Sequence, residues 1–186
     1  MAIFLNDPEV LIQEYYLRLY RTARMMMPLT IRNIRKDDNP VIAELIRKIF
    51  REFKIDRPGT VYTDPTTDAL YELFQTKGAE YWLAEENGKL LGGCGIYPTE
   101  GLPAGCVELV KFYLSTEARG KGLGKKLMEQ SIASARKLGY TKVYLESFPE
   151  LSTAVGMYEK AGFKKLDVPM GNSGHYACTL WMILDL

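Results

Sequence analysis

The sequence contains a single histidine, His175, and only three cysteines, Cys94, Cys106 and Cys178. One histidine argues against a zinc site built from several histidines, and we predict no metal site. An odd number of widely spaced cysteines argues against a disulfide framework and indicates reduced thiols in a cytoplasmic protein. The sequence has no run of 18 apolar residues, so we expect neither a transmembrane helix nor a membrane partner.

The chain also lacks an excess of either charge. It contains 24 lysines and arginines and 23 aspartates and glutamates. This balance gives no reason to expect a nucleic-acid partner. The first residues lack the basic-then-apolar order of a secretory signal, because Asp7 and Glu9 come too early. What is present is ordinary for a globular protein, since 186 residues that are 47% hydrophobic suit one domain with an appended helix.

The N-terminal segment predicts a helix of its own. Asp7-Pro8-Glu9 supplies a capping Asp, a Pro at the first helical position and an acid in the first turn. Apolar residues then fall on one helical face, namely Ile12, Tyr15, Tyr16, Leu19, Tyr20 and Ala23. Two interpretations remain open: a helix that docks or joins a homodimer, and a stretch that precedes a natural start near Met27. We therefore predict a helical extension at residues 1–27 and a domain at residues 28–186.

From residue 28 onward the apolar pattern alternates between strand and helix. Helices are predicted to begin at residues 37–40, 64–65 (ending at Gly78), 119–120 and near 149. Strands are predicted at 29–34, 81–84, 90–97, 107–114, 143–146, 163–168 and 176–185, with a hairpin turn at Asn87-Gly88. This alternation indicates an α/β protein with a mixed sheet covered by helices on both faces.

The most informative stretch follows the strand at 107–114. After a short loop comes Arg119-Gly120-Lys121-Gly122-Leu123-Gly124, at the predicted start of a helix. Glycines let the backbone approach a ligand closely, and the free N–H groups of a helix start favour an anion such as pyrophosphate. The spacing fits neither a Walker loop nor a dinucleotide fingerprint. The alternative is a glycine-rich helix entry without a ligand.

Two segments carry a family resemblance. Arg119-x-x-Gly122-x-Gly124 resembles the acetyl-CoA signature of the GCN5-related N-acetyltransferases (GNAT), and Ala154-x-x-x-Tyr158-x-x-x-Gly162-Phe163 resembles that family's second segment. The resemblance extends from residue 28 to residue 186. It implies a three-layer α/β/α GNAT fold, whose central mixed, mostly antiparallel sheet is splayed between the fourth and fifth strands.

The resemblance also implies a function. It indicates an N-acetyltransferase that moves an acetyl group from acetyl-CoA, its co-substrate, directly to an amine of a small molecule or peptide. The alternative is a catalytically silent acyl-CoA-binding module with a regulatory role. The cofactor-binding residues that the resemblance implies are Phe112, Tyr113, Leu114, Arg119, Gly120, Lys121, Gly122, Leu123, Gly124 and Lys125. Many members have an Asn where this chain has Leu151, and the hydroxyl of Ser152 is the candidate replacement.

Three side chains are candidates for proton transfer. Tyr158 matches the family tyrosine that protonates the departing CoA thiolate, although a core tyrosine would show the same pattern. Glu108 matches a position often used as general base, and the alternative is an exposed strand glutamate. Glu146, on the following strand, is a second candidate base. His175 is also within reach on a loop, where a structural role is the commoner one.

The acceptor site is expected from residues 50–72 and 168–177. Candidate apolar walls are Tyr62, Tyr71, Phe74 and Tyr176, and candidate partners for a cation are Asp64, Asp68 and Glu72. The alternative, that these are ordinary surface residues of loops and helices, is slightly favoured. The mixture does not select among an amino acid, a polyamine, an aminoglycoside and a peptide amine.

Overall fold

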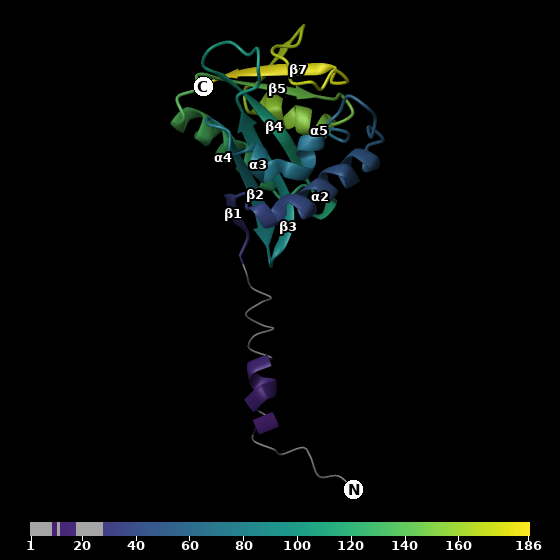
Figure 1. Cartoon of the computed structure of the whole chain (residues 1–186), viewed down its shortest axis with the longest axis vertical. Helices are drawn as coiled ribbons and strands as arrows, with labels where there is room; N and C mark the ends of the chain where they lie inside the picture. The colour runs from purple at the N-terminus through teal and green to yellow at the C-terminus, as the bar shows by residue number, and fades with distance from the viewer. Residues whose placement is uncertain (1–8, 11, 18–27) are drawn as a thin grey trace.

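The computed structural model describes residues 9–10, 12–17 and 28–186 (Figure 1). Residues 9–10 and 12–17 are helical, and the side chains of Tyr15 and Tyr16 are exposed. The rest of the predicted extension, including the boundary at Met27, lies outside the described residues. The division at residue 28 and the role of the extension in a homodimer therefore stay predictions. Within the described ranges, no helix has the length and apolar character needed to cross a membrane.

Seven strands form one sheet in the order β1-β2-β3-β4-β5-β7-β6. They are β1 (Thr30–Asn33), β2 (Glu80–Glu86), β3 (Lys89–Tyr97), β4 (Cys106–Leu114), β5 (Lys142–Ser147), β6 (Lys164–Leu166) and β7 (Leu180–Asp185). The described helices are α2 (Asn39–Glu52), α3 (Leu70–Leu73), α4 (Leu123–Lys137) and α5 (Ser152–Lys160). Strands β4 and β5 are parallel and the other described pairs are antiparallel. The predicted α/β fold class is confirmed.

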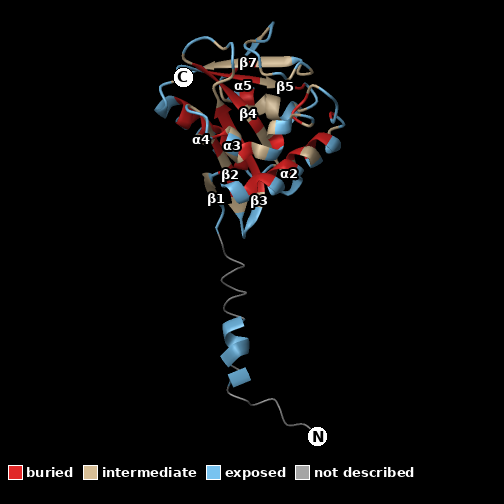
Figure 2. Cartoon of the chain, viewed as in Figure 1, coloured by how far each residue is buried: buried red, intermediate tan, exposed pale blue. Residues whose placement is uncertain are grey.

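The core has two halves, one on each face of the sheet. The buried residues lie along the strands and on parts of the helices (Figure 2). Side chains alternate across a strand, so neighbouring residues of β2 enter different halves. Leu83 packs with residues of α2 and α3, whereas Ala84 packs with residues of α4 and with Tyr158 of α5. Each helix therefore buries its apolar face on the sheet, which is the three-layer arrangement.

Strands β4 and β5 separate partway along their length. Their pairing runs from Cys106 opposite Lys142 to Leu109 opposite Leu145, and the described strands show no pairing beyond that point. On its other edge β4 contains a bulge, because Gly93 lies opposite Tyr113 and Gly95 opposite Val110. Residues 110–114 of β4 are thus unpaired on the β5 side, as the predicted splay between the fourth and fifth strands requires.

One bulge residue has an unusual backbone. Lys111 has φ of 49°, a left-handed conformation that side chains rarely adopt. The hydroxyl of Tyr81 donates a hydrogen bond of 2.8 Å to the carbonyl of Lys111. The buried tyrosine on β2 therefore holds the bulge in place across β3, the strand that lies between β2 and β4.

Three predicted boundaries are corrected by the structure. The helix predicted from Arg119 begins at Leu123, because Gly120 and Gly122 both have φ of 74° and cannot belong to a right-handed helix. The helix predicted from residue 64 to 78 is a 3₁₀ turn (Pro65–Ala69) followed by the short α3. The last strand begins at Leu180 rather than 176, because the Ala177 N–H bonds to the Gly59 carbonyl at 3.2 Å instead of to β5.

Candidate active site

A cavity of about 390 Å³ lies between the free end of β4, the loop before α4 and the start of α5. Most of the predicted cofactor-binding residues line it, namely Phe112, Tyr113, Leu114, Arg119, Gly120, Gly122, Gly124, Lys125 and Ser152. Leu151, the residue that departs from the family pattern, lines it as well. The separation of β4 from β5 opens this cavity, which we call the cofactor cleft.

The glycines of the loop serve two different purposes. A Cβ on Gly120 or Gly122 would meet nothing within 4 Å, so the left-handed backbone, rather than lack of space, requires glycine there. A Cβ on Gly124 would lie 3.0 Å from Leu114 Cδ1, so this glycine lets α4 approach β4 closely. The result is a helix N-terminus, without acidic residues in its first turn, at the edge of the cofactor cleft. Such an N-terminus favours a bound anion.

Arg119 connects the loop to two other elements. Its guanidinium forms an ion pair with Glu52 of α2, with Nη2 and Oε2 at 3.0 Å, and its Nε donates to the Leu114 carbonyl at 3.1 Å. It also lies over the ring of Phe53, 5.1 Å from the centroid. Although Arg119 lines the cofactor cleft, these contacts make it a side chain that positions the loop.

Two predicted cofactor-binding residues have side chains elsewhere. Lys121 lines a separate hollow together with Leu29 and Glu117. Leu123 is 3% exposed and packs in the core under α4. Successive side chains of the loop, and of the helical turn that follows it, point in different directions. These two side chains therefore do not enter the cofactor cleft.

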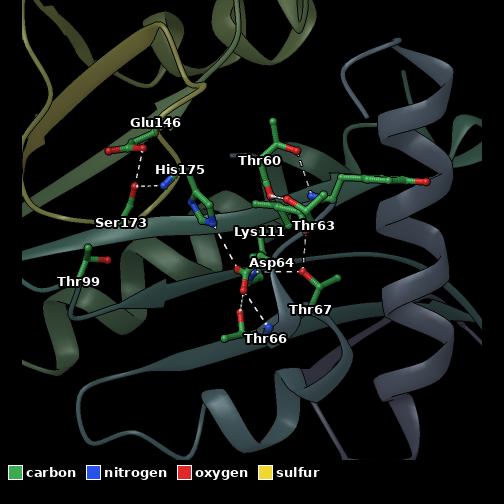
Figure 3. Close-up of polar contacts among 12 residues, drawn as sticks. Thr60, Thr63, Asp64, Thr66, Thr67, Thr99, Lys111, Glu146, Ser173 and His175 are labelled. Carbon is green, nitrogen blue, oxygen red and sulfur yellow. Dashed lines mark hydrogen bonds and ion pairs between the residues drawn. The ribbon is translucent and has the colours of Figure 1, made fainter. Parts of the chain in front are cut away.

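A second cavity, of about 590 Å³, is lined by residues 97–100 and 172–176, the loop at residues 59–66, and β4 (Figure 3). We call it the acceptor cavity. Asp64 and Tyr176 line it, as predicted.

The other predicted acceptor residues have structural contacts instead. Phe74 stacks on Tyr81 in the core with centroids 4.7 Å apart, and Tyr62 and Tyr71 pack against the same half of the core. Asp68 pairs with Arg47 at 2.6 Å, and Glu72 accepts a hydrogen bond of 2.7 Å from Asn39. None of these five side chains lines the acceptor cavity as the structure describes it, which corrects the expectation.

Glu108 lies on β4 at the back of the acceptor cavity. Its exposed fraction is 3%, which excludes the alternative of an exposed strand glutamate. Burial raises the pKa of Glu108 to about 8, the hydrogen bond from the Thr99 hydroxyl opposes this shift, and the charge of Glu146 adds to it. A carboxyl group with such a pKa can exchange a proton near neutral pH.

Glu146 and His175 approach Glu108 from β5 and from the loop before β7. Glu146 accepts a hydrogen bond of 2.8 Å from the hydroxyl of Ser173 (Figure 3). It accepts a second one, of 2.9 Å, from the hydroxyl of Tyr144. Oxygen atoms of Glu108 and Glu146 and a ring nitrogen of His175 all lie within 4.8 Å of one another. Three groups that are distant in sequence thus converge where β4 and β5 separate.

The sequence reasoning missed Lys111. Its side chain is 3% exposed, and its Nζ lies 2.7 Å from Asp64 Oδ2, which also lies 3.3 Å from His175 Nε2 (Figure 3). Burial raises the pKa of Asp64, but the bonds from His175 and Lys111 outweigh it and hold this pKa well below its usual range. Burial lowers the pKa of Lys111, and Asp64 opposes that shift. The available signal was a lysine within the otherwise apolar residues 109–114.

Tyr158 lies on α5 between the two cavities. Its ring packs against Phe112 at 6.1 Å and Phe163 at 5.8 Å between centroids. It lines a third, small cavity of about 50 Å³ together with Glu108, Glu146 and His175. This cavity shares Glu108 and His175 with the acceptor cavity and Phe112 and Tyr113 with the cofactor cleft, and we call it the passage. Burial raises the pKa of Tyr158, so the hydroxyl keeps its proton. Within the described part of the chain, the Tyr158 hydroxyl has no hydrogen-bond partner.

Comparisons with known proteins agree with this geometry. A model of the acetyltransferase (GNAT) family matches residues 43–163. The chain is 36% identical over 157 residues to the uncharacterized N-acetyltransferase YjgM of Escherichia coli, covering 84% of this chain and 94% of that protein. It is 29% identical over 128 residues to N-acetyltransferase 8B of Rattus norvegicus, covering 68% of this chain and 54% of that protein.

Solved structures share the fold. An acetyltransferase of the GNAT family from Staphylococcus aureus superposes with a TM-score of 0.74 at 21% identity, covering 85% of this chain and 99% of that one. The structure of yncA from Salmonella typhimurium, solved with its cofactor acetyl-CoA, superposes with a TM-score of 0.66 at 24% identity, covering 85% and 94%. The family match spans more than half of the chain, and the chain therefore belongs to the GNAT acetyltransferase family. It is an acyltransferase with acetyl-CoA as co-substrate.

Proposed function

We propose that this protein transfers an acetyl group from acetyl-CoA directly to an amine of a small molecule or peptide. The observation that carries the proposal is the passage between the cofactor cleft and the acceptor cavity, lined by Tyr158, Glu108, Glu146 and His175. Donor and acceptor entering from opposite sides would meet there. Such positioning lowers the entropic part of the barrier to a two-substrate reaction.

The cofactor cleft holds acetyl-CoA in this proposal. The N–H groups around Gly120 and Gly122 and the N-terminus of α4 bind the pyrophosphate, with Lys125 nearby. The unpaired end of β4, residues 112–114, offers backbone groups to the pantetheine arm. The backbone N–H of Phe112 polarises the thioester carbonyl, and such a donor to a developing oxyanion is worth roughly 3 kcal/mol in comparable sites.

In the chemical step the amine nitrogen attacks the thioester carbon and the carbon–sulfur bond breaks. The nitrogen loses one proton to a base, and the CoA thiolate gains one from an acid. Glu108 is the favoured base because its pKa near 8 matches the task, with Glu146 and His175 beside it. Tyr158 is the acid, because it is protonated and lines the passage from the side of the cofactor cleft.

Steady-state release of free CoA thiol tests this proposal, with a panel of amino acids, polyamines, aminoglycosides and basic peptides as acceptors. Calorimetric binding of acetyl-CoA is measured in parallel. If any amine is acetylated and the reaction depends on Tyr158, the result supports the proposed acetyltransferase activity. Tight acetyl-CoA binding with no turnover across the panel favours the alternative, a silent acyl-CoA-binding module. The convergence of Glu108 and Tyr158 on one passage counts against that alternative.

A further inference from the structure

We infer that the acceptor is a small aliphatic amine that carries a second positive charge and no carboxylate, such as a diamine. This inference rests on the proposed function and narrows its substrate class. Two features of the acceptor cavity support it. The described lining residues offer no free basic group for an anion, and hydrogen-bond acceptor atoms converge at the inner end of the cavity.

An amino acid would require a partner for its carboxylate. Of the described residues that line the acceptor cavity, Lys111 and His175 are the basic ones. The side chain of Lys111 is 3% exposed, and its ammonium group is paired with Asp64 at 2.7 Å and lies 3.5 Å from the Thr67 hydroxyl. It is therefore committed to Asp64.

His175 is paired with Asp64. The carboxylate of Asp64 is ionised and can only accept a hydrogen bond, so its contact at 3.3 Å with His175 Nε2 places the ring proton on Nε2. A ring nitrogen of His175 also lies within 4.8 Å of oxygen atoms of Glu108 and Glu146. A substrate carboxylate at this ring would therefore lie beside two acidic side chains.

The inner end of the cavity suits an ammonium group. Glu108, Glu146 and His175 each contribute an atom, and the three atoms lie within 4.8 Å of one another. Three acceptors at about 2.8 Å around a tetrahedral ammonium stand roughly 4.6 Å apart. Hydroxyl groups hold both carboxylates in place, from Thr99 to Glu108 and from Ser173 to Glu146 at 2.8 Å.

The outer part of the cavity carries a further negative charge. Glu100 lines it, is exposed, and forms no ion pair within the described part of the chain. Tyr176 also lines the cavity, is 80% exposed, and offers an aromatic ring to an aliphatic chain or to a cation. A chain with ammonium groups at both ends meets carboxylates at both ends of the cavity.

Matched acceptors test the inference. Initial rates are measured with cadaverine, with lysine, which differs from it by one α-carboxylate, and with pentylamine, which lacks the second ammonium. EDTA is present so that no divalent metal occupies the same three atoms. We expect kcat/KM for cadaverine to exceed that for lysine by at least tenfold and that for pentylamine severalfold. A rate constant for lysine equal to or above that for cadaverine overturns the inference and leaves the acetyltransferase intact.

A variant pair separates the outer charge from general effects. Glu100→Gln should raise KM for cadaverine severalfold, with kcat and the constants for pentylamine unchanged. Glu86→Gln makes the same charge change at an exposed position away from the cavity and should alter nothing. An unchanged KM for cadaverine in Glu100→Gln contradicts the inference that Glu100 binds the second positive charge of the acceptor.

Failure of the proposed function gives a different result. If no amine is acetylated, calorimetry of cadaverine and lysine with the CoA-bound protein decides the inference on its own. Binding of cadaverine that exceeds that of lysine tenfold and is weakened by Glu146→Gln supports the cation site without the enzyme. Absence of cadaverine binding overturns the inference as well.

Discussion

The ammonium of Lys111 and the carboxylate of Asp64 form an ion pair of 2.7 Å across 47 positions of sequence, with the lysine side chain 3% exposed. Lys111 stands in the bulge of β4, where that strand separates from β5. Asp64 stands in the loop that forms one wall of the acceptor cavity and also contacts His175. One buried charge pair therefore joins the bulge, the acceptor loop and the loop before β7.

Breaking this pair should cost stability in a particular pattern. Asp64→Asn leaves a buried lysine without its counter-charge and should lower the free energy of unfolding by about 3 kcal/mol. Lys111→Met together with Asp64→Asn should recover part of the loss, because no charge is then left unpaired. Urea denaturation of both variants measures this. The control is Asp68→Asn, which removes the exposed pair with Arg47 and should cost less than about 1 kcal/mol.

The pKa of Glu108 predicts the pH dependence of the rate. The group is a base only when ionised, so kcat/KM should rise with pH up to about 8 and then level off. Glu108→Gln should lower kcat/KM about 100-fold above that pH and should flatten this limb of the profile. If the variant keeps the wild-type rise of kcat/KM with pH, the base is Glu146, His175 or water.

The same carboxyl group should affect stability with the opposite sign. The folded protein holds the Glu108 proton more tightly than the unfolded chain, because burial raises its pKa from 4.5 to about 8. Its contribution to stability is fully present below pH 4.5 and is lost as pH rises to about 8. Wild type should therefore lose more stability over this window than Glu108→Gln. Denaturation curves at several pH values check the difference, and parallel curves for the two proteins would contradict the assignment.

Tyr158→Phe should separate turnover from cofactor binding. The change keeps the ring that packs on Phe112 and Phe163 but removes the hydroxyl that is the proposed acid. We expect kcat to fall about 100-fold, within the range for loss of a general acid. Acetyl-CoA affinity by calorimetry should be unchanged. Turnover at the wild-type level would exclude Tyr158 as the acid.

The two ends of α4 offer a matched pair of glycines. Gly122 and Gly139 have φ of 74° and 86°, and a Cβ at either would meet nothing within 4 Å. Substitution by Glu should therefore cost similar stability at both positions, because an L-residue is strained there. Gly122→Glu should abolish acetyl-CoA binding by blocking the turn and repelling phosphate, whereas Gly139→Glu should leave it unchanged. Retained binding in Gly122→Glu would move the pyrophosphate site elsewhere.

Much of the candidate site could be predicted because it depends on local backbone chemistry. Gly122 and Gly124 mark a strand-to-helix turn of the kind whose free N–H groups favour anions, and local residue types suffice to indicate such a turn. The residues around Asp64 were harder. A carboxylate on a loop that contacts a cation produces no periodic pattern in the sequence. Asp64 and Asp68 look alike in sequence, but Asp64 is buried with Lys111, whereas Asp68 pairs with Arg47 at the surface.

The sequence by itself determined the alternation of helices and strands, the glycine turn before α4 and the family to which they belong, because periodicity and turn chemistry act over a few residues. Only the tertiary structure decided that Glu108 is buried, that Glu146 and His175 lie beside it, and that Lys111 is bound to Asp64. These relationships arise where β4 separates from β5 and loops distant in sequence cover the gap. Desolvation and charge pairing depend on those distant neighbours, which local sequence patterns do not specify.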